Sequence, residues 1–169
     1  MKERIIDFVA SLGLPPEVAT LLLSALPITE LRASIPFAHG VLGLSLPIAF
    51  FWAFLGSLLP GIAILLAGER LIAFGNRKSR RFKKVIGRKL EKTQKAFSKK
   101  YEKYGEPGLA VFVGIPLPLT GVWTGSLAAL IFGIPFRRAF PLIAVGNAFA
   151  GIIVTLATAG ILSFADGHL

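Results

Sequence analysis

The sequence predicts an all-α integral membrane protein, in which two inverted repeats each combine a re-entrant helical hairpin with a transmembrane helix. Only 17% of the 169 residues are charged, whereas soluble domains carry about 25% charged residues. Residues 33–68, 107–136 and 139–165 are three long runs whose only ionisable side chain is His39. Each run exceeds the roughly 20 apolar residues that cross a bilayer. Prolines and glycines also recur in the same order about ninety residues apart, which favours an internal duplication.

The N-terminal residues 1–14 predict a short amphipathic helix at the membrane interface. Apolar residues such as Ile5 and Phe8 are interspersed with charged ones over residues 2–12, as in helices that lie in the interface plane. Gly13 and the prolines that follow it end the helix. Charged residues of both signs and two prolines lie where a signal peptide would have its apolar core, so we expect no cleavable signal peptide.

The first repeat, expected at residues 15–68, contains segments of unsuitable length for simple crossings. Residues 18–29 would form about 18 Å of helix, less than the bilayer core of about 30 Å. Residues 33–68 would form about 54 Å, too long for one crossing and too short for two. Glycines at 40 and 43 and a proline at 47 divide this run. We therefore expect a half-helix that enters the membrane, a turn, and a second half-helix that returns to the same side by about residue 44. A full transmembrane span should follow over about 46–68.

The segment 69–105 is strongly basic. Residues 70–103 hold 14 of the 19 Lys and Arg residues and only two acidic ones. Apolar residues recur through it at helical spacing, which predicts a long amphipathic helix along the membrane surface or against a partner. A solvated connector is the alternative. By the positive-inside rule residues 70–104 are cytoplasmic, and nucleic-acid binding is not expected.

The second repeat, expected at residues 106–163 before a tail at 164–169, follows the same plan. Its proline-rich turn, 115–125, precedes a span from 139 to about 162. Because the basic segment joins the first span to the second hairpin, the two hairpins should open to opposite sides of a cell membrane, with both termini outside. Such inverted repeats build transporter sites from broken helices. Two transmembrane spans alone enclose little space for a transport pathway, so we expect a homo-oligomer, namely a dimer.

Glu30 and Arg32 are the strongest functional signal in the sequence. An ionised side chain at mid-membrane costs roughly 2.5–3.5 kcal/mol and usually faces protein or water. Residues two apart on a regular helix point in nearly opposite directions, so these two are not expected to pair with each other. Glu30 would carry a proton or a cation, and Arg32 would hold a phosphate or carboxylate. The alternative is that both lie in an aqueous loop.

Other residues have expected roles by their position and type. His39 is expected to be a packed or interfacial histidine. The sequence contains no cysteine, nucleophile with a base, paired carboxylates or phosphate loop, so we expect no metal, cofactor or enzymatic activity. The predicted substrate or ion pathway comprises Thr29, Glu30, Arg32, Thr120, Trp123 and Thr124. The predicted hairpin tips comprise Pro27, Pro36, Pro116, Pro118, Gly121 and Gly125. Arg137 and Arg138 are assigned to topology and lipid headgroups, and Asn147 to a helix–helix contact.

Two motifs carry a family resemblance. PITELRASIP at 27–36 and PLPLTGVWTG at 116–125 resemble the small multi-drug export protein family, over about residues 20–160. That family is in turn similar to the DedA (VTT-domain) superfamily, whose members have re-entrant helices flanked by spans. The first resemblance implies export of a small molecule, and the second implies flipping or scrambling of lipid phosphates. Arg137, Arg138 and Pro141 only approximate the DedA arginine–proline signature. A non-transporting membrane scaffold is a third reading.

Overall fold

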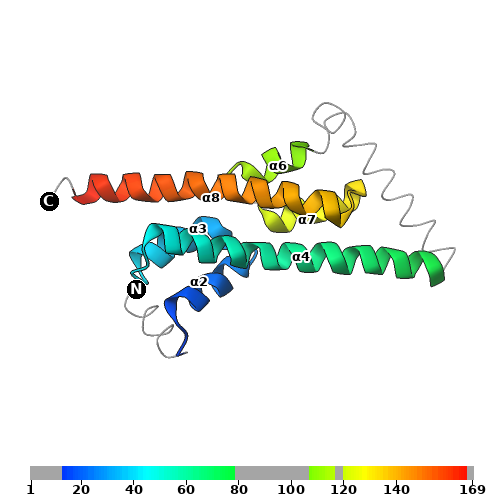
Figure 1. Ribbon diagram of the computed structural model, residues 1–169, viewed down its shortest axis with the longest axis horizontal. Coiled ribbons are helices and arrows are strands. Elements are labelled where there is room, and N and C mark those ends of the chain that lie inside the picture. The colour runs from blue at the N-terminus through cyan, green and yellow to red at the C-terminus, as the bar shows by residue number, and fades with distance from the viewer. Residues whose placement is uncertain (1–12, 79–106, 117–119, 167–169) are drawn as a thin grey trace. The chain divides into compact units, whose positions relative to one another are not determined.

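The computed structural model describes residues 13–78, 107–116 and 120–166 (Figure 1). Within these ranges the regular elements are all α-helices, which confirms the predicted all-α class. Residues 1–12 of the predicted interfacial helix, residues 79–105 of the basic segment and residues 167–169 of the tail lie outside the described residues. Residues 164–166, predicted to belong to the tail, are helical. The helices are α2 (Pro16–Ala25), α3 (Glu30–Gly40), α4 (Leu46–Lys78), α6 (Pro107–Gly114), α7 (Val122–Phe132) and α8 (Phe136–Asp166).

Two of the described helices are long and apolar enough to cross a membrane. Their apolar stretches are Leu46–Gly68, with mean hydropathy 2.1, and Phe136–Ile161, with mean hydropathy 2.0. The first has the predicted bounds. The second begins three residues earlier than predicted, because the carbonyl of Pro135 accepts the N–H groups of Arg138 and Ala139 and so starts the helix. The short helices α2 and α6, of 10 and 8 residues, would extend only about 15 and 12 Å.

The chain packs as two compact units that divide both long helices. One unit contains Met1–Pro60 and Asn147–Leu169, and the other contains Gly61–Gly146. Each unit therefore holds one pair of short helices and one part of each long helix. This division by packing differs from the division into sequence repeats, because α4 and α8 each contribute to both units.

In the first unit, α3 packs on the long helices. Leu31 and Ile35 form one buried cluster with Ala53 of α4 and Ala150 of α8. One turn later in α4, Ser57 bonds to Asn147, which lies one turn earlier in α8. The two helix segments are therefore antiparallel where they meet.

In the second unit, glycines allow close approach between helices. A side chain at Gly146 would meet the carbonyl oxygen of Ala110 in α6, and one at Gly125 would meet Val113. A side chain at Gly61 would meet Val122 of α7. Only a residue without Cβ fits such contacts, which fixes α6 and α7 against the long-helix segments of this unit.

Burial recurs along the chain with the same offset as the sequence motifs. Residues 46–61 and 136–151, ninety residues apart, have the same degree of burial at every position except 58 and 60. Residues 30–41 and 121–132, which are 91 apart, differ only at 33. The correspondence seen in prolines and glycines thus extends to how each side chain is packed.

Candidate functional site

The break between α2 and α3 is built by local backbone chemistry. Leu26 is extended, and Pro27 has no N–H to continue the helix. The Thr29 hydroxyl donates to the carbonyl of Leu23, and the N–H of Glu30 donates to the carbonyl of Leu26 at 3.0 Å. These bonds satisfy carbonyls that an interrupted helix would leave open, and they hold the turn that precedes α3.

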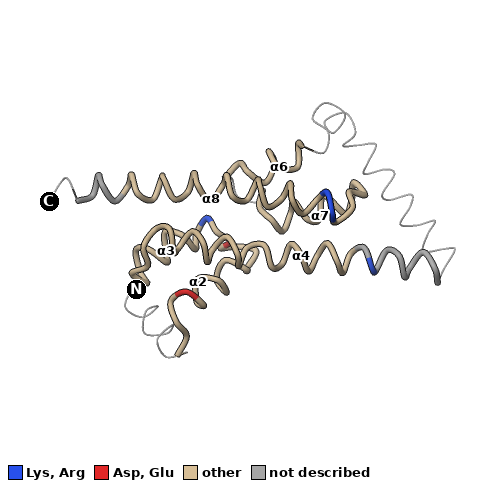
Figure 2. The backbone as a smooth tube through the Cα atoms, in the orientation of Figure 1, with Lys and Arg blue, Asp and Glu red and all other residues tan. Residues whose placement is uncertain are grey.

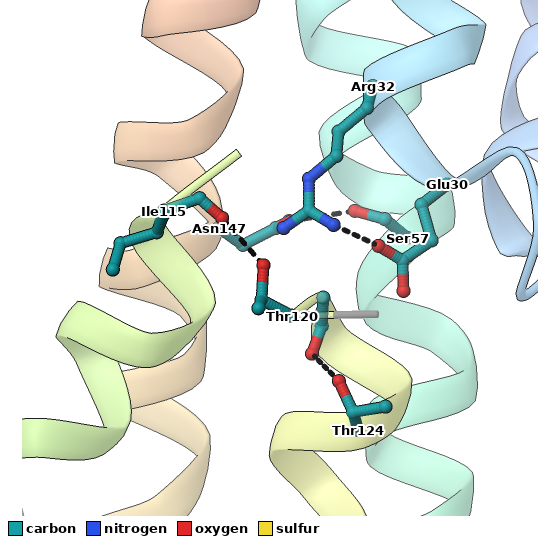
Figure 3. Close-up of polar contacts among 8 residues, drawn as sticks. Glu30, Arg32, Ser57, Ile115, Thr120, Thr124 and Asn147 are labelled. Atoms are coloured by element: carbon teal, nitrogen blue, oxygen red, sulfur yellow. Dashed lines mark hydrogen bonds and ion pairs between the residues drawn. The ribbon is translucent and has the colours of Figure 1, made fainter. Parts of the chain in front are cut away.

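Glu30 has a left-handed backbone conformation, with φ of 40°. Only glycine adopts such a φ without strain, and for other residues it costs about 1–2 kcal/mol. Because the helix is not regular at this point, the Glu30 side chain can reach Arg32. Arg32 Nη1 lies 3.4 Å from Glu30 Oε2 (Figure 3). The expectation that the two would not pair was therefore wrong, and the positive φ is the reason.

This ion pair is largely withdrawn from the surface of the molecule. The exposed fraction is 10% for the Glu30 side chain and 18% for the Arg32 side chain. Charged residues are sparse elsewhere along the described helices (Figure 2). A buried carboxylate can take up a proton or a cation, and a guanidinium can bind a carboxylate or phosphate with two parallel hydrogen bonds. In this structure each charge is partly neutralised by the other.

Buried polar side chains accompany the pair in the same unit. Asn147 Nδ2 donates to Ser57 Oγ at 2.7 Å (Figure 3). That hydroxyl donates to the carbonyl of Phe54 at 2.9 Å. The predicted helix contact of Asn147 therefore has a specific partner. Ser34 Oγ is buried and has no hydrogen-bond partner among the described residues. Neither serine was among the predicted site residues. The repeat offset of ninety residues relates Ser57 to Asn147, and this was the signal that could have indicated Ser57.

The break between α6 and α7 uses a similar hydroxyl bond without charges. Thr120 Oγ1 donates to the carbonyl of Ile115 at 2.7 Å. Thr124 Oγ1 donates to the carbonyl of Gly121, the residue that precedes α7, at 3.1 Å. Trp123 is half-buried. The three predicted pathway residues of this break thus lie together, and both threonine hydroxyls donate to backbone carbonyls.

The predicted tip residues divide into two groups. Pro27 and Pro116 lie in the breaks and are exposed, whereas Pro36 lies inside α3 and Gly125 is buried inside α7. Pro36 and Gly125 are therefore parts of helices and not of the turns. Pro118 lies outside the described residues.

Arg137, Arg138 and His39 were also singled out in the sequence, and the structure shows where each lies. Arg137 and Arg138 are exposed in the first turn of α8. The His39 ring Nδ1 lies 2.7 Å from the carbonyl of Leu44. Since a carbonyl accepts, His39 donates from Nδ1 and fastens the loop between α3 and α4, which fits a packed histidine. Among the residues that the structure describes, no three His, Cys, Asp or Glu side chains are grouped as metal ligands would be.

Comparison with known proteins gives one family match, which begins just after the first break and includes the second. A family model described as "Putative small multi-drug export protein" matches residues 30–153, from the first residue of α3 into the second half of α8. Neither a curated protein nor a solved structure matches the chain. Together with this match, the two apolar helices indicate a membrane protein. The chain belongs to the putative small multi-drug export protein family.

Proposed function

We propose that the protein is a secondary transporter that moves a small molecule or ion past the break between α2 and α3, coupled to protons through Glu30. The observation that carries this proposal is the buried ion pair of Glu30 and Arg32 at an interrupted helix. The export activity in the family name is of the same kind.

Buried charges and interrupted helices are both costly in lipid. Charged side chains within a membrane cost several kcal/mol, and where they occur they generally mark substrate, ion or proton pathways. Interrupted helices expose backbone groups that lipid cannot satisfy, so such breaks line cavities. A charged pair at a helix break combines both features, as in transporters with discontinuous helices.

Inverted repeats at 15–68 and 106–163 are part of the proposal, and three observations support them. Burial recurs at an offset of ninety residues along α4 and α8. The parts of these two helices that meet in the first unit, residues 46–60 and 147–156, run antiparallel. Ser57 and Asn147, which correspond under that offset, bond to each other. A residue meets its own counterpart when a two-fold relation connects the repeats, and a simple translation does not produce that contact.

We propose further that the protein lies in the cell membrane with residues 70–104 in the cytoplasm and both termini outside. The chain has no cysteine, so single cysteines introduced as Glu3→Cys and Asp166→Cys can be labelled without background. In intact cells both should react with a membrane-impermeant maleimide, and an Arg88→Cys variant should react only after lysis. Labelling of Arg88→Cys in intact cells contradicts this orientation.

A second candidate function is the flipping or scrambling of lipids, which would agree with the proposed relationship to the DedA superfamily. The observation in its favour is an apolar groove of about 270 Å³ in the first unit. Phe50 lines the groove from α4 and Leu156 from α8, and Thr155 adds one hydroxyl. Such a groove can hold an acyl chain while an arginine receives the phosphate. A dimer, proposed for either function, would enlarge the enclosed surface.

Reconstitution into liposomes tests these functions with a small panel of solutes and a labelled lipid. Trapped pyranine reports proton movement after addition of ethidium, benzoate or sulfate, and quenching of a labelled phosphatidylglycerol reports lipid movement. A transporter gives solute-dependent proton movement that Glu30→Gln abolishes, whereas the matched variant Glu17→Gln retains it. Lipid movement without a gradient and without proton coupling supports the second function and refutes the first. If neither protons nor lipids move, the result supports the third reading, a non-transporting membrane scaffold.

A further inference from the structure

We infer that Glu30 and Arg32 form a charge-operated switch, in which protonation of Glu30 opens the break between α2 and α3 and makes Arg32 available to an anion. The inference deepens the proposed function and rests on it: it assigns the site an anionic substrate that binds together with a proton. Two features of Glu30 in this break depend on each other.

The first feature is backbone strain. Glu30 is the only described non-glycine residue with positive φ, and a bulky side chain there is unfavourable. The second is the ion pair, which the strained conformation makes possible although the two residues are only two apart. Attraction between the charges therefore offsets the strain. When Glu30 is protonated the attraction is lost, and the strain favours relaxation of the residue.

Relaxation changes what Arg32 can bind. While Glu30 is charged, its carboxylate occupies the side of the guanidinium at Nη1. A carboxylate, sulfate or phosphate competes for the same donors. Once Glu30 is neutral, its carboxylate no longer offsets the charge of the mostly buried guanidinium, which favours an incoming anion. Proton uptake and anion uptake are thereby linked, and for a monovalent anion they leave the net charge of the site unchanged.

Other described ionisable groups of this unit are distant along their elements. On α2, which packs against α3, Glu17 lies at the opposite end from the break. On α3, His39 is nine residues beyond Glu30, about 13 Å along the helix. The parts of α4 and α8 that pack on α3, residues 46–60 and 147–161, contain no ionisable side chain. Glu30 and Arg32 are thus the pair whose charge state decides the conformation of the break.

A spin label in the break tests the conformational part in the full-length protein. Ile28 is 94% exposed, so Ile28→Cys carries a label without disturbing packing. Label mobility should rise as pH falls from about 8 to about 4, in the direction that protonates carboxylates. Adding Glu30→Gln should give high mobility at every pH, with amide exchange at residues 26–33 roughly 5- to 30-fold faster, the ratio expected for the uncompensated strain.

Glu30→Gly separates strain from charge. It removes the carboxylate but accepts the positive φ without strain, so the label should stay immobile and independent of pH. Glu17→Gln should behave like the parent protein. A parent protein without a pH response, or a Glu30→Gly variant as mobile as Glu30→Gln, overturns the switch.

Anion binding is measured by calorimetry with sulfate in a neutral detergent, because the charge of sulfate stays constant over this pH range. Glu30→Gln should bind sulfate at neutral pH at least tenfold more tightly than the parent protein. The parent should approach that affinity at acidic pH, and Arg32→Gln should bind at neither pH. Equal binding by Arg32→Gln overturns the inference. Parallel titration with a short-chain phosphatidic acid distinguishes a lipid headgroup from a free anion by which of them binds more tightly.

The two proposals fail separately. If protons move in liposomes with ethidium and with neither benzoate nor sulfate, the transporter stands and the anion inference is refuted. If sulfate binds as described and nothing moves across the bilayer, the switch stands and the proposed transport is refuted.

Discussion

The breaks after α2 and after α6 have the same framework and different chemistry. In each, a threonine hydroxyl donates to a carbonyl at the end of the preceding short helix: Thr29 to Leu23, and Thr120 to Ile115. The helices that follow, α3 and α7, have nearly the same pattern of burial. Under the same correspondence Glu30 takes the place of Gly121, and Arg32 takes the place of Trp123.

The difference teaches that the charges are not needed to make the break. Gly121 precedes α7 with φ of −87°, and the described part of that break has neither a charge nor a strained residue. At the first break Glu30 is strained and paired. Since the uncharged break forms without them, strain and charge at the first break are not needed to interrupt the helix. This agrees with the proposed function, because strained residues cluster at functional sites.

The largest expected effect tests the shared framework. Gly56 faces the carbonyl oxygen of Leu21, and Gly146 faces the carbonyl oxygen of Ala110, which lies 89 residues after Leu21. Gly56→Ala and Gly146→Ala should each destabilise the protein by about 3 kcal/mol, because the added methyl would overlap backbone. Thermal unfolding in detergent measures this. Gly40→Ala is the control, since nothing lies within 4 Å of its added Cβ. Loss of stability in only one of the two variants would break the comparison.

The next effect tests the threonine bonds. Thr29→Val and Thr120→Val preserve shape but leave the carbonyls of Leu23 and Ile115 without the hydroxyl. Each should lose about 1–2 kcal/mol of unfolding free energy, and serine at either position should restore most of it. Chemical denaturation of the purified variants measures the loss. If valine is harmless at 120 and harmful at 29, the two breaks do not share a framework.

Much of this framework was predictable from residue spacing. Helices too short to cross, prolines at 27 and 116, and apolar runs of defined length locate both breaks and the span beginning at residue 46. These predictions depend on the length of helix that a segment can form, which the sequence specifies directly.

The ion pair and the compact units could not be predicted in this way. Pairing of Glu30 with Arg32 depends on one backbone angle, and regular-helix geometry gives the opposite answer. The units divide α4 and α8 at Pro60 and Gly146, and that division follows from contacts between segments far apart in sequence. Hydropathy along a helix carries no information about which half packs with which neighbours.

A smaller effect tests the correspondence of Ser57 with Asn147. Ser57→Ala and Asn147→Ala should show a coupling of about 0.6 kcal/mol, and no more than about 1.7 kcal/mol, as for hydrogen bonds between membrane helices. A double-mutant cycle in unfolding free energy measures the coupling. Additive losses would mean that the bond between these corresponding residues contributes no stability.

The smallest effect concerns buried hydroxyls on α3 and α7. Ser34 Oγ and Ser126 Oγ are both buried without a hydrogen-bond partner among the described residues. A buried hydroxyl without a partner is unfavourable, so Ser34→Ala and Ser126→Ala should raise the unfolding free energy, each by less than about 1 kcal/mol after the small loss of packing. Thermal unfolding distinguishes this outcome from destabilisation. If Ser34→Ala is destabilising while Ser126→Ala is not, the Ser34 hydroxyl has a hydrogen-bond partner in the membrane-embedded protein. The helix after the charged break would then have a polar contact that the helix after the uncharged break lacks.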